Sequence, residues 1–285
     1  MYSQEITRRH RAAIVIAIDQ SCSMSGKMSL SGVTFSKSEA VSMVVGRLID
    51  ELVMRSRRDE GYRHYYDIAL VGYSGDRVYS LLDDELKFYP ITVLAGREIP
   101  RINYMLRHKT LGGGMHSFQE EVSQWVKPCA QGATPMYQMM CRVTNLVAEW
   151  CAKEENRDSF PPIVFNVTDG EASDAGYEKL RSAALTLRST GTSDGKTLFV
   201  NVHISSNTNH IPIMFPNACE VPLSIQHAHL LMDMSSIVPE QLHSYIRENR
   251  ESSSQPPYIA MSYNASVSEL VVMLNIGSRS VNIGL

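Results

Sequence analysis

Residues 12–25 read AAIVIAIDQSCSMS, and this stretch does most to decide how the chain folds. Residues 12–18 form an unbroken apolar run rich in β-branched side chains, which is typical of a central parallel strand covered on both faces. The run ends at Asp19, and a polar loop rich in Gly and Ser follows to about Phe35. The stretch therefore predicts a buried strand that delivers Asp19 to a polar edge of a sheet.

The alternation of strand and helix patterns continues through the first two-thirds of the chain. Ser36 and Glu39 form a capping box that opens a predicted helix to about Arg55. Further strands are predicted at 67–73, 162–168 and 198–204, a short edge strand at 78–82, and helices at 118–126, 135–153 and 177–187. Strands that alternate with helices in this way predict an α/β fold with a doubly wound sheet.

The C-terminal third has a looser pattern that prolines interrupt. Helical spacing is still present at 225–232, 239–247 and 267–274. A length of 285 residues allows one large α/β domain or two small ones. We expect a single domain over residues 1–285, with a core at about 11–205 and with 206–285 completing or decorating it.

Composition excludes several classes of function. A net charge of −3 gives none of the basic footprint that nucleic-acid binding needs. We expect no secretory signal, because residues 1–11 are polar and basic, and no membrane-spanning helix, because no apolar run is long enough. The five cysteines are an odd number and contain no C-x-x-C pair, which argues against a disulfide framework or a structural zinc site. We expect a soluble cytoplasmic protein with neither nucleic acid nor membrane as a partner.

Three separated pieces of the chain place oxygen-bearing side chains in loops beside predicted strands or helices. They are Asp19 with Ser21 and Ser23, then Thr134 before the long helix, then Asp169 after a buried strand. Ligands of doubly wound sheets bind beyond the carboxyl ends of the strands. Hard divalent cations prefer oxygen ligands, and Mg²⁺ also keeps several waters. The sequence therefore predicts a divalent-metal site with an open position for an acidic side chain of a partner.

The D-x-S-x-S pattern from Asp19 to Ser23, followed by a Thr and then an Asp, resembles the metal-ion-dependent adhesion site of von Willebrand A domains. The resemblance covers about residues 11–205. It implies a three-layer αβα sandwich around a mostly parallel sheet with one antiparallel edge strand. It also implies that Ser21, Ser23 and Thr134 bind Mg²⁺ (or Mn²⁺ or Ca²⁺) directly, and that Asp19 and Asp169 bind it directly or through water.

The resemblance further implies metal-mediated binding of a partner protein that offers an Asp or Glu carboxylate, and no catalysis. Two features depart from the family pattern. Cys22 stands where many members have Gly, and the segments 83–115 and 206–285 are longer than a minimal domain needs. Because we expect a cytoplasmic protein, a role in adhesion at a cell surface is not expected. Among family members, the chain most resembles the bacterial intracellular ones associated with tellurite-resistance-type gene clusters.

Two other functions compete with this interpretation. A bound metal could activate water or a phosphoryl group for hydrolysis, although only Glu171 lies close enough in sequence to act as a base. Alternatively, the loops could hold no metal, because Ser and Asp are also common turn formers and caps, and the chain would then be a scaffold.

Other motifs have simpler interpretations than a binding site. Gly112-Gly113-Gly114 lacks the rest of a phosphate-loop pattern and is expected to be a flexible turn. His227 and His229 would point to different sides of a helix, so a shared metal is not expected. Asp174 lies close enough to Asp169 in the sequence to shape the rim of the metal site.

Overall fold

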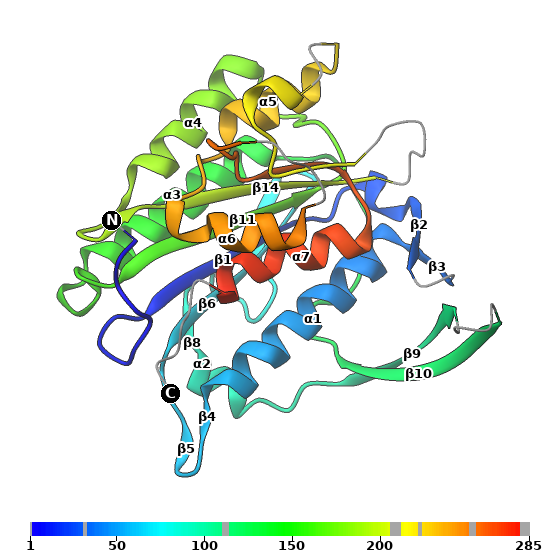
Figure 1. Ribbon diagram of the computed structural model, residues 1–285, viewed down its shortest axis with the longest axis horizontal. Helices are drawn as coiled ribbons and strands as arrows, with labels where there is room; N and C mark the ends of the chain where they lie inside the picture. Colours follow the sequence, from blue (N-terminus) through cyan, green and yellow to red (C-terminus); the bar gives the residue numbers. More distant parts are fainter. Residues whose placement is uncertain are drawn as a thin grey trace.

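The computed structural model describes residues 2–30, 33–109, 114–205, 212–221, 224–250 and 255–279. An eight-stranded sheet runs through its centre, in the order β15-β16-β14-β11-β1-β6-β7, with β8 also paired to β6 (Figure 1). The parallel strands are β16 (Met261–Ala265), β14 (Leu198–Ile204), β11 (Phe160–Thr168), β1 (Ala12–Asp19) and β6 (Tyr66–Ser74). The antiparallel ones are β7 (Arg77–Ser80), β8 (Tyr89–Pro90) and β15 (Ile213–Met214).

Strand β1 is the middle of the sheet, as its apolar run predicts. It pairs in parallel with β6 on one side and with β11 on the other, and all of its residues are buried. Because successive side chains point to opposite faces, Ile14, Ile16 and Ile18 pack into one hydrophobic core while Val15 and Ala17 pack into the other. Burying apolar side chains on both faces is what fixes this strand in the centre.

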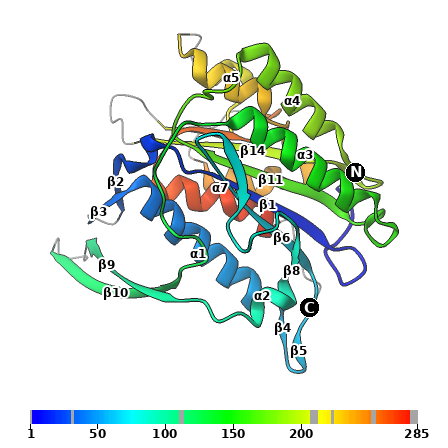
Figure 2. The ribbon, with the colours of Figure 1, turned by 180° about the vertical axis from the view of Figure 1, so that it is seen from behind.

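Helices cover both faces of the sheet. On one face lie α1 (Lys37–Ser56), α2 (Ile91–Ala95), α6 (His243–Asn249) and α7 (Val267–Arg279). On the other lie α3 (Met136–Ala152), α4 (Tyr177–Ser189) and α5 (Gln226–Met234) (Figures 1 and 2). The expected three-layer α/β sandwich with a mostly parallel sheet is confirmed. Antiparallel pairing occurs at both edges, however, where the resemblance implied one such strand.

Short elements connect this framework. The 3-10 helices are η1 (Cys22–Ser25), η2 (Glu154–Asn156), η3 (Ala218–Glu220) and η4 (Glu240–Leu242). The two-stranded hairpins are β2 (Lys27–Leu30) with β3 (Val33–Ser36), β4 (Arg57–Arg58) with β5 (Gly61–Tyr62), β9 (Arg101–Lys109) with β10 (Met115–Ser123), and β12 (Gly191–Thr192) with β13 (Gly195–Lys196). The capping box at the start of α1 is present as expected.

The helix expected at 118–126 is wrong, because residues 118–123 belong to strand β10 in the hairpin with β9, and residues 124–126 form neither helix nor strand. Val122 forms a small hydrophobic cluster with Met43 of α1 and Leu106 of β9, and Phe118 packs against this cluster. A spacing of four residues keeps two side chains on one face of a helix, but it does the same in a strand with a period of two. Residues 91–95 form the short helix α2, for which the sequence pattern gives no clear prediction.

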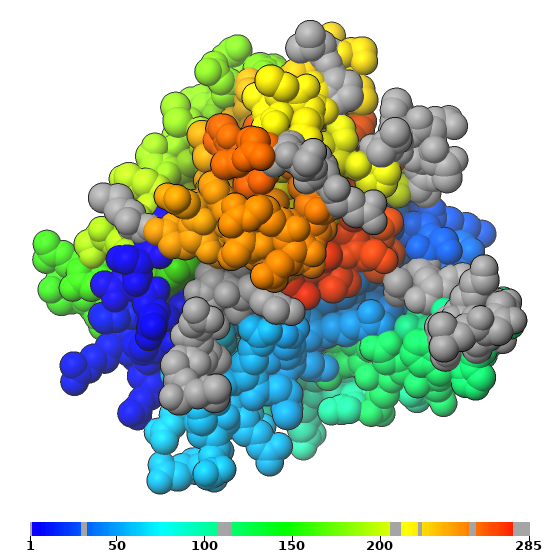
Figure 3. All heavy atoms as spheres, viewed as in Figure 1, coloured from blue at the N-terminus to red at the C-terminus, as the bar shows by residue number. Residues whose placement is uncertain are grey.

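The C-terminal region contributes to both the sheet and its helical layers. The helices expected at 225–232, 239–247 and 267–274 correspond to α5, to η4 with α6, and to α7. Strand β16 pairs in parallel with β14, which extends the sheet beyond the elements that the sequence predicted. The space-filling view shows α6 and α7, in orange to red, over one face of the molecule (Figure 3). Gly112 and Gly113 lie outside the described residues.

The described helices give no support for a membrane-spanning segment. None of them has both the length and the apolar content to cross a bilayer.

Candidate metal centre

The loops that follow β1 and β11 meet at one edge of the sheet. These two strands are parallel neighbours, and Ile18 lies opposite Val167 in their register. Asp19 is the last residue of β1, and Asp169 directly follows the last residue of β11. The two carboxylates therefore reach the same edge because of strand pairing, as the sequence predicted from their positions after apolar runs.

Asp19 is fully buried and held by two hydrogen bonds. The backbone N–H of Ser21 donates to Oδ1 at 2.9 Å, and the Thr168 hydroxyl donates to Oδ2 at 2.7 Å. Burial raises the pKa of Asp19, and the negative charge of Asp169 adds to this, although hydrogen bonds from Ser21 and Thr168 act in the opposite direction. The site therefore holds a carboxylate whose charge has too little compensation from the protein itself.

Ser21, Ser23 and Asp169 form a continuous chain of polar contacts. The two serine hydroxyl oxygens are 3.0 Å apart, and the Ser23 hydroxyl donates to Oδ1 of Asp169 at 2.6 Å. The turn η1 curves the backbone so that both hydroxyls face the same place. Ser21 is buried, whereas Ser23 is exposed, so the group of oxygens opens to solvent at Ser23.

Thr134 is tied to the same loops through its backbone. Its N–H donates to the Ser173 hydroxyl and its carbonyl accepts from the Ser173 N–H, both at 3.0 Å. Two residues earlier, the carbonyl of Gly132 accepts a hydrogen bond from the N–H of Cys22 at 3.0 Å. Within the described part of the chain the Thr134 hydroxyl makes no hydrogen bond.

The start of α3 is capped by a residue from a distant part of the chain. The helix begins at Met136 with Pro135 in the cap position, and Thr134 does not cap it with its side chain. The two carboxylate oxygens of Asp174 instead accept hydrogen bonds from the N–H groups of Tyr137 and Gln138, each at 3.0 Å. Asp174 therefore satisfies helix-terminal donors from the loop that follows Asp169, a long-range cap that no local pattern indicates.

Lys37 is a charged residue of this centre that no sequence pattern predicts. Its Nζ lies 2.8 Å from Oδ2 of Asp169, and the two side chains are 11% and 0% exposed. Lys37 is the first residue of α1, where the helix dipole disfavours a positive charge and a lysine is expected to point into solvent. No signal close to Lys37 in the sequence shows that Asp169 is its partner.

The residues present fit a hard divalent cation. The donors at the meeting point of the loops are carboxylate and hydroxyl oxygens, which suit Mg²⁺, Mn²⁺ or Ca²⁺. Nowhere in the described residues do three or more His, Cys, Asp or Glu side chains gather as a metal-binding group. The centre thus supplies two carboxylates with hydroxyl neighbours, a set that leaves coordination positions for water or for an outside ligand.

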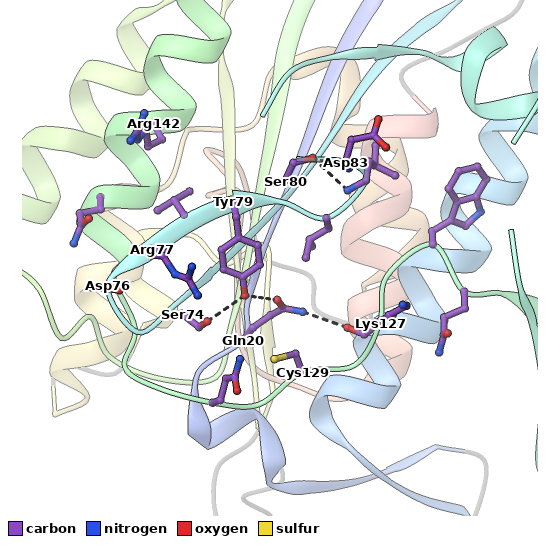
Figure 4. A pocket seen from close by; sticks show the side chains of 17 residues that line it. Gln20, Ser74, Asp76, Arg77, Tyr79, Ser80, Asp83, Lys127, Cys129 and Arg142 are labelled. Carbon is purple, nitrogen blue, oxygen red and sulfur yellow. Dashed lines mark hydrogen bonds between the residues drawn. The ribbon is translucent and has the colours of Figure 1, made fainter. Parts of the chain in front are cut away.

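A polar cleft of about 900 Å³ lies beside the loop that follows β1. Gln20, the residue after Asp19, forms part of its wall: Oε1 accepts from the Tyr79 hydroxyl at 2.6 Å, and Nε2 donates to the Lys127 carbonyl at 3.3 Å (Figure 4). Arg77 and Arg142 also line the cleft. These two hydrogen bonds join the Gln20 side chain, at the end of β1, to β7 and to the segment at Lys127.

Comparison with known proteins gives matches among solved structures alone. No protein-family model matches the chain, and no curated protein sequence does. A von Willebrand factor type A protein from Catenulispora acidiphila is 12% identical with a TM-score of 0.40, over 69% of this chain and 34% of that one. The chain thus spans about a third of that structure.

Two further solved structures match almost the whole chain. The vWF domain of the type V pilus tip protein Mfa5 from Porphyromonas gingivalis is 9% identical with a TM-score of 0.47, over 96% of both chains. Proximal thread matrix protein 1 from the mussel byssus has a zinc-occupied metal-ion-dependent adhesion site (MIDAS) motif. It is 12% identical with a TM-score of 0.45, over 96% of this chain and 47% of that one. Of these three, the first is named a von Willebrand factor type A protein, the second a vWF domain, and the third carries a MIDAS motif.

Proposed function

We propose that the loops at Asp19, Thr134 and Asp169 hold one divalent cation, and that this cation binds a carboxylate of a partner protein. Ser21, Ser23 and Thr134 would bind the cation through their hydroxyls, and Asp19 and Asp169 directly or through water. The observation that carries the proposal is the unbroken network from Asp19 through Ser21 and Ser23 to Asp169, with both carboxylate groups shielded from solvent.

The choice of cation follows from the donor atoms. Mg²⁺ takes six oxygen ligands and gives up its waters reluctantly, so it binds well where a protein supplies few carboxylates. Mn²⁺ and Ca²⁺ have the same preference for oxygen. A cation held this way keeps at least one exchangeable position, and the exposed Ser23 marks the side from which an Asp or Glu side chain could reach it. Mussel proximal thread matrix protein 1 holds zinc in a MIDAS motif.

Binding is favoured over catalysis by the surroundings of the proposed cation. Metal-dependent hydrolysis needs a base placed to take a proton from water. Glu171 is the nearest carboxylate in sequence to Asp169, but it is exposed and no hydrogen bond joins it to the network of Asp19, Ser21, Ser23 and Asp169 within the described residues. We therefore propose an interaction module, with the whole chain acting as one unit because β16 extends the sheet that carries the site.

A short acidic peptide tests the binding function directly. A peptide with one Asp should bind in the presence of Mg²⁺ or Mn²⁺, and the same peptide with Asn in place of Asp should not. The reason is that the amide carries no charge to offset the cation. Fluorescence anisotropy with a labelled peptide at millimolar metal measures this binding. The relaxation rate of water protons, which bound Mn²⁺ enhances, should also fall when the peptide carboxylate displaces a water from the Mn²⁺.

The controls separate binding from hydrolysis. EDTA and Asp19→Ala should each abolish peptide binding, whereas Glu171→Ala should leave it unchanged. Binding of the Asp peptide that persists in EDTA contradicts the proposal. Hydrolysis of a generic phosphoester that depends on metal and is lost in Glu171→Ala would favour an enzyme instead.

A further inference from the structure

The ion pair between Lys37 and Asp169 is the most buried one between Lys or Arg and a carboxylate in the described part of the chain. Its Nζ–Oδ2 distance is 2.8 Å, and the Asp169 side chain has no exposed surface. The other oxygen of Asp169 accepts from Ser23. Both oxygens of one proposed metal ligand are therefore engaged within the protein, one by a hydroxyl and one by a full positive charge.

The position of Lys37 suggests a role beyond stabilising its helix. A positive charge in the first turn of a helix opposes the dipole. The start of α1 is already satisfied by the capping box of Ser36 and Glu39, in which Lys37 takes no part. The lysine therefore gains nothing from the helix, and its buried contact with Asp169 accounts for its placement.

Gly26 leaves room for the Lys37 side chain to reach Asp169. The backbone N–H of Lys37 donates to the carbonyl of Gly26 at 2.7 Å. A Cβ atom at Gly26 would lie 3.2 Å from Cε and 3.4 Å from Nζ of Lys37, so the side chain passes directly over this glycine. The ammonium group is thus tethered beside the network of oxygens.

We propose that the Lys37 ammonium is an internal cation that occupies Asp169 in the metal-free protein and must leave it when a divalent cation binds. This inference rests on the proposed metal site. The two carboxylates carry a charge of −2, and Lys37 offsets one unit of it. An incoming divalent cation would take over Asp169 and Ser23 and would repel the ammonium, so each metal-binding event has to displace Lys37. The lysine thereby weakens metal affinity and keeps the loops together in the absence of metal.

Replacement of the lysine tests the competition. Lys37→Met keeps most of the side-chain length and removes the charge. We expect its dissociation constant for Mn²⁺, measured by electron paramagnetic resonance of free Mn²⁺, to fall about tenfold relative to the wild type. Lys37→Arg keeps the charge and should retain the weaker affinity of the wild type. Lys27→Met, an exposed lysine in β2, makes the same change in net charge and should leave affinity within about twofold.

A second measurement on the wild-type protein follows the lysine itself. Acetylation of Lys37, read by mass spectrometry, should be slow in EDTA and become several-fold faster in Mn²⁺, because the ammonium leaves its buried pair. Lys27 should label at the same rate in both conditions. Equal Mn²⁺ affinity in the wild type and Lys37→Met, together with labelling that ignores metal, would overturn the inference. If the wild type binds no Mn²⁺ at all, the proposed metal site itself fails.

Discussion

Asp19→Asn is expected to stabilise the metal-free protein near neutral pH and to remove its response to Mg²⁺. Asp19 is fully buried beside a second carboxylate, and burial followed by the charge of Asp169 raises its pKa. The charge therefore opposes folding when no metal is present, and the isosteric amide relieves that cost. At a Mg²⁺ concentration a hundredfold above Kd, the wild type should gain about 2.7 kcal/mol of stability, and Asp19→Asn should gain none.

The pH dependence of this difference has a defined sign. The folded-state pKa of Asp19 lies above its unfolded value of about 3.9. As pH rises through the interval between these two values, the unfolded state has released its proton while the folded state still holds it, so the wild type loses stability relative to Asp19→Asn. Below about pH 4 the two proteins should converge. Urea unfolding in EDTA from pH 4 to pH 8 measures this.

Asp76→Asn provides a matched control, since Asp76 is exposed in the turn after β6. It makes the same chemical change without touching the buried network, and its stability should follow that of the wild type in EDTA and in Mg²⁺. An Asp19→Asn protein that is less stable in EDTA and still gains stability from Mg²⁺ would contradict this account of Asp19.

Gly132→Ala is expected to destabilise the fold by roughly 2–4 kcal/mol and to weaken metal binding. Gly132 has a φ of +75°, a conformation that costs other residues free energy, and an added Cβ would lie 2.7 Å from the backbone nitrogen of Gly75. Relief of this contact has to move the loop that carries Thr134, because the Gly132 carbonyl also accepts from Cys22. Chemical denaturation and Mn²⁺ titration measure the two effects.

Gly75→Ala separates the cost of a positive φ from the cost of the close contact. Gly75 has a similar φ of +64°, but no atom lies within 4 Å of a Cβ placed there. It should show the strain of the left-handed backbone alone, about 1 kcal/mol. If Gly132→Ala costs no more than Gly75→Ala and binds Mn²⁺ like the wild type, the close packing at Gly132 does not position Thr134.

Local patterns predicted the parts of the fold that local physical chemistry determines. The apolar run before Asp19 indicates its burial on both faces, and the capping box at Ser36 marks the start of α1 within the sequence itself. Strand β10 was mistaken for a helix because a spacing of four between Phe118 and Val122 is common to both periods. Strand β16 was missed because its five residues mix apolar and polar side chains, and only pairing with β14 defines it.

The candidate site also contains residues that local sequence patterns predict and contacts that they do not. The positions of Asp19 and Asp169 follow from strand ends, which an apolar run reveals. The ion pair of Lys37 with Asp169 and the capping of α3 by Asp174 join residues far apart in the chain. Such contacts depend on the final packing of the loops, and a lysine at the start of a helix carries no sequence signal for its partner.

The central claim is that Ser21 and Ser23 help to hold a divalent cation. Thermal unfolding of the wild type and of the double variant Ser21→Ala/Ser23→Ala, each in EDTA and in millimolar Mg²⁺ or Mn²⁺, tests it most directly. We predict that metal raises the Tm of the wild type and leaves that of the double variant unchanged. An equal rise in both proteins would place the cation elsewhere, and an unchanged Tm in both, with no Mn²⁺ bound by the wild type, would contradict the metal site.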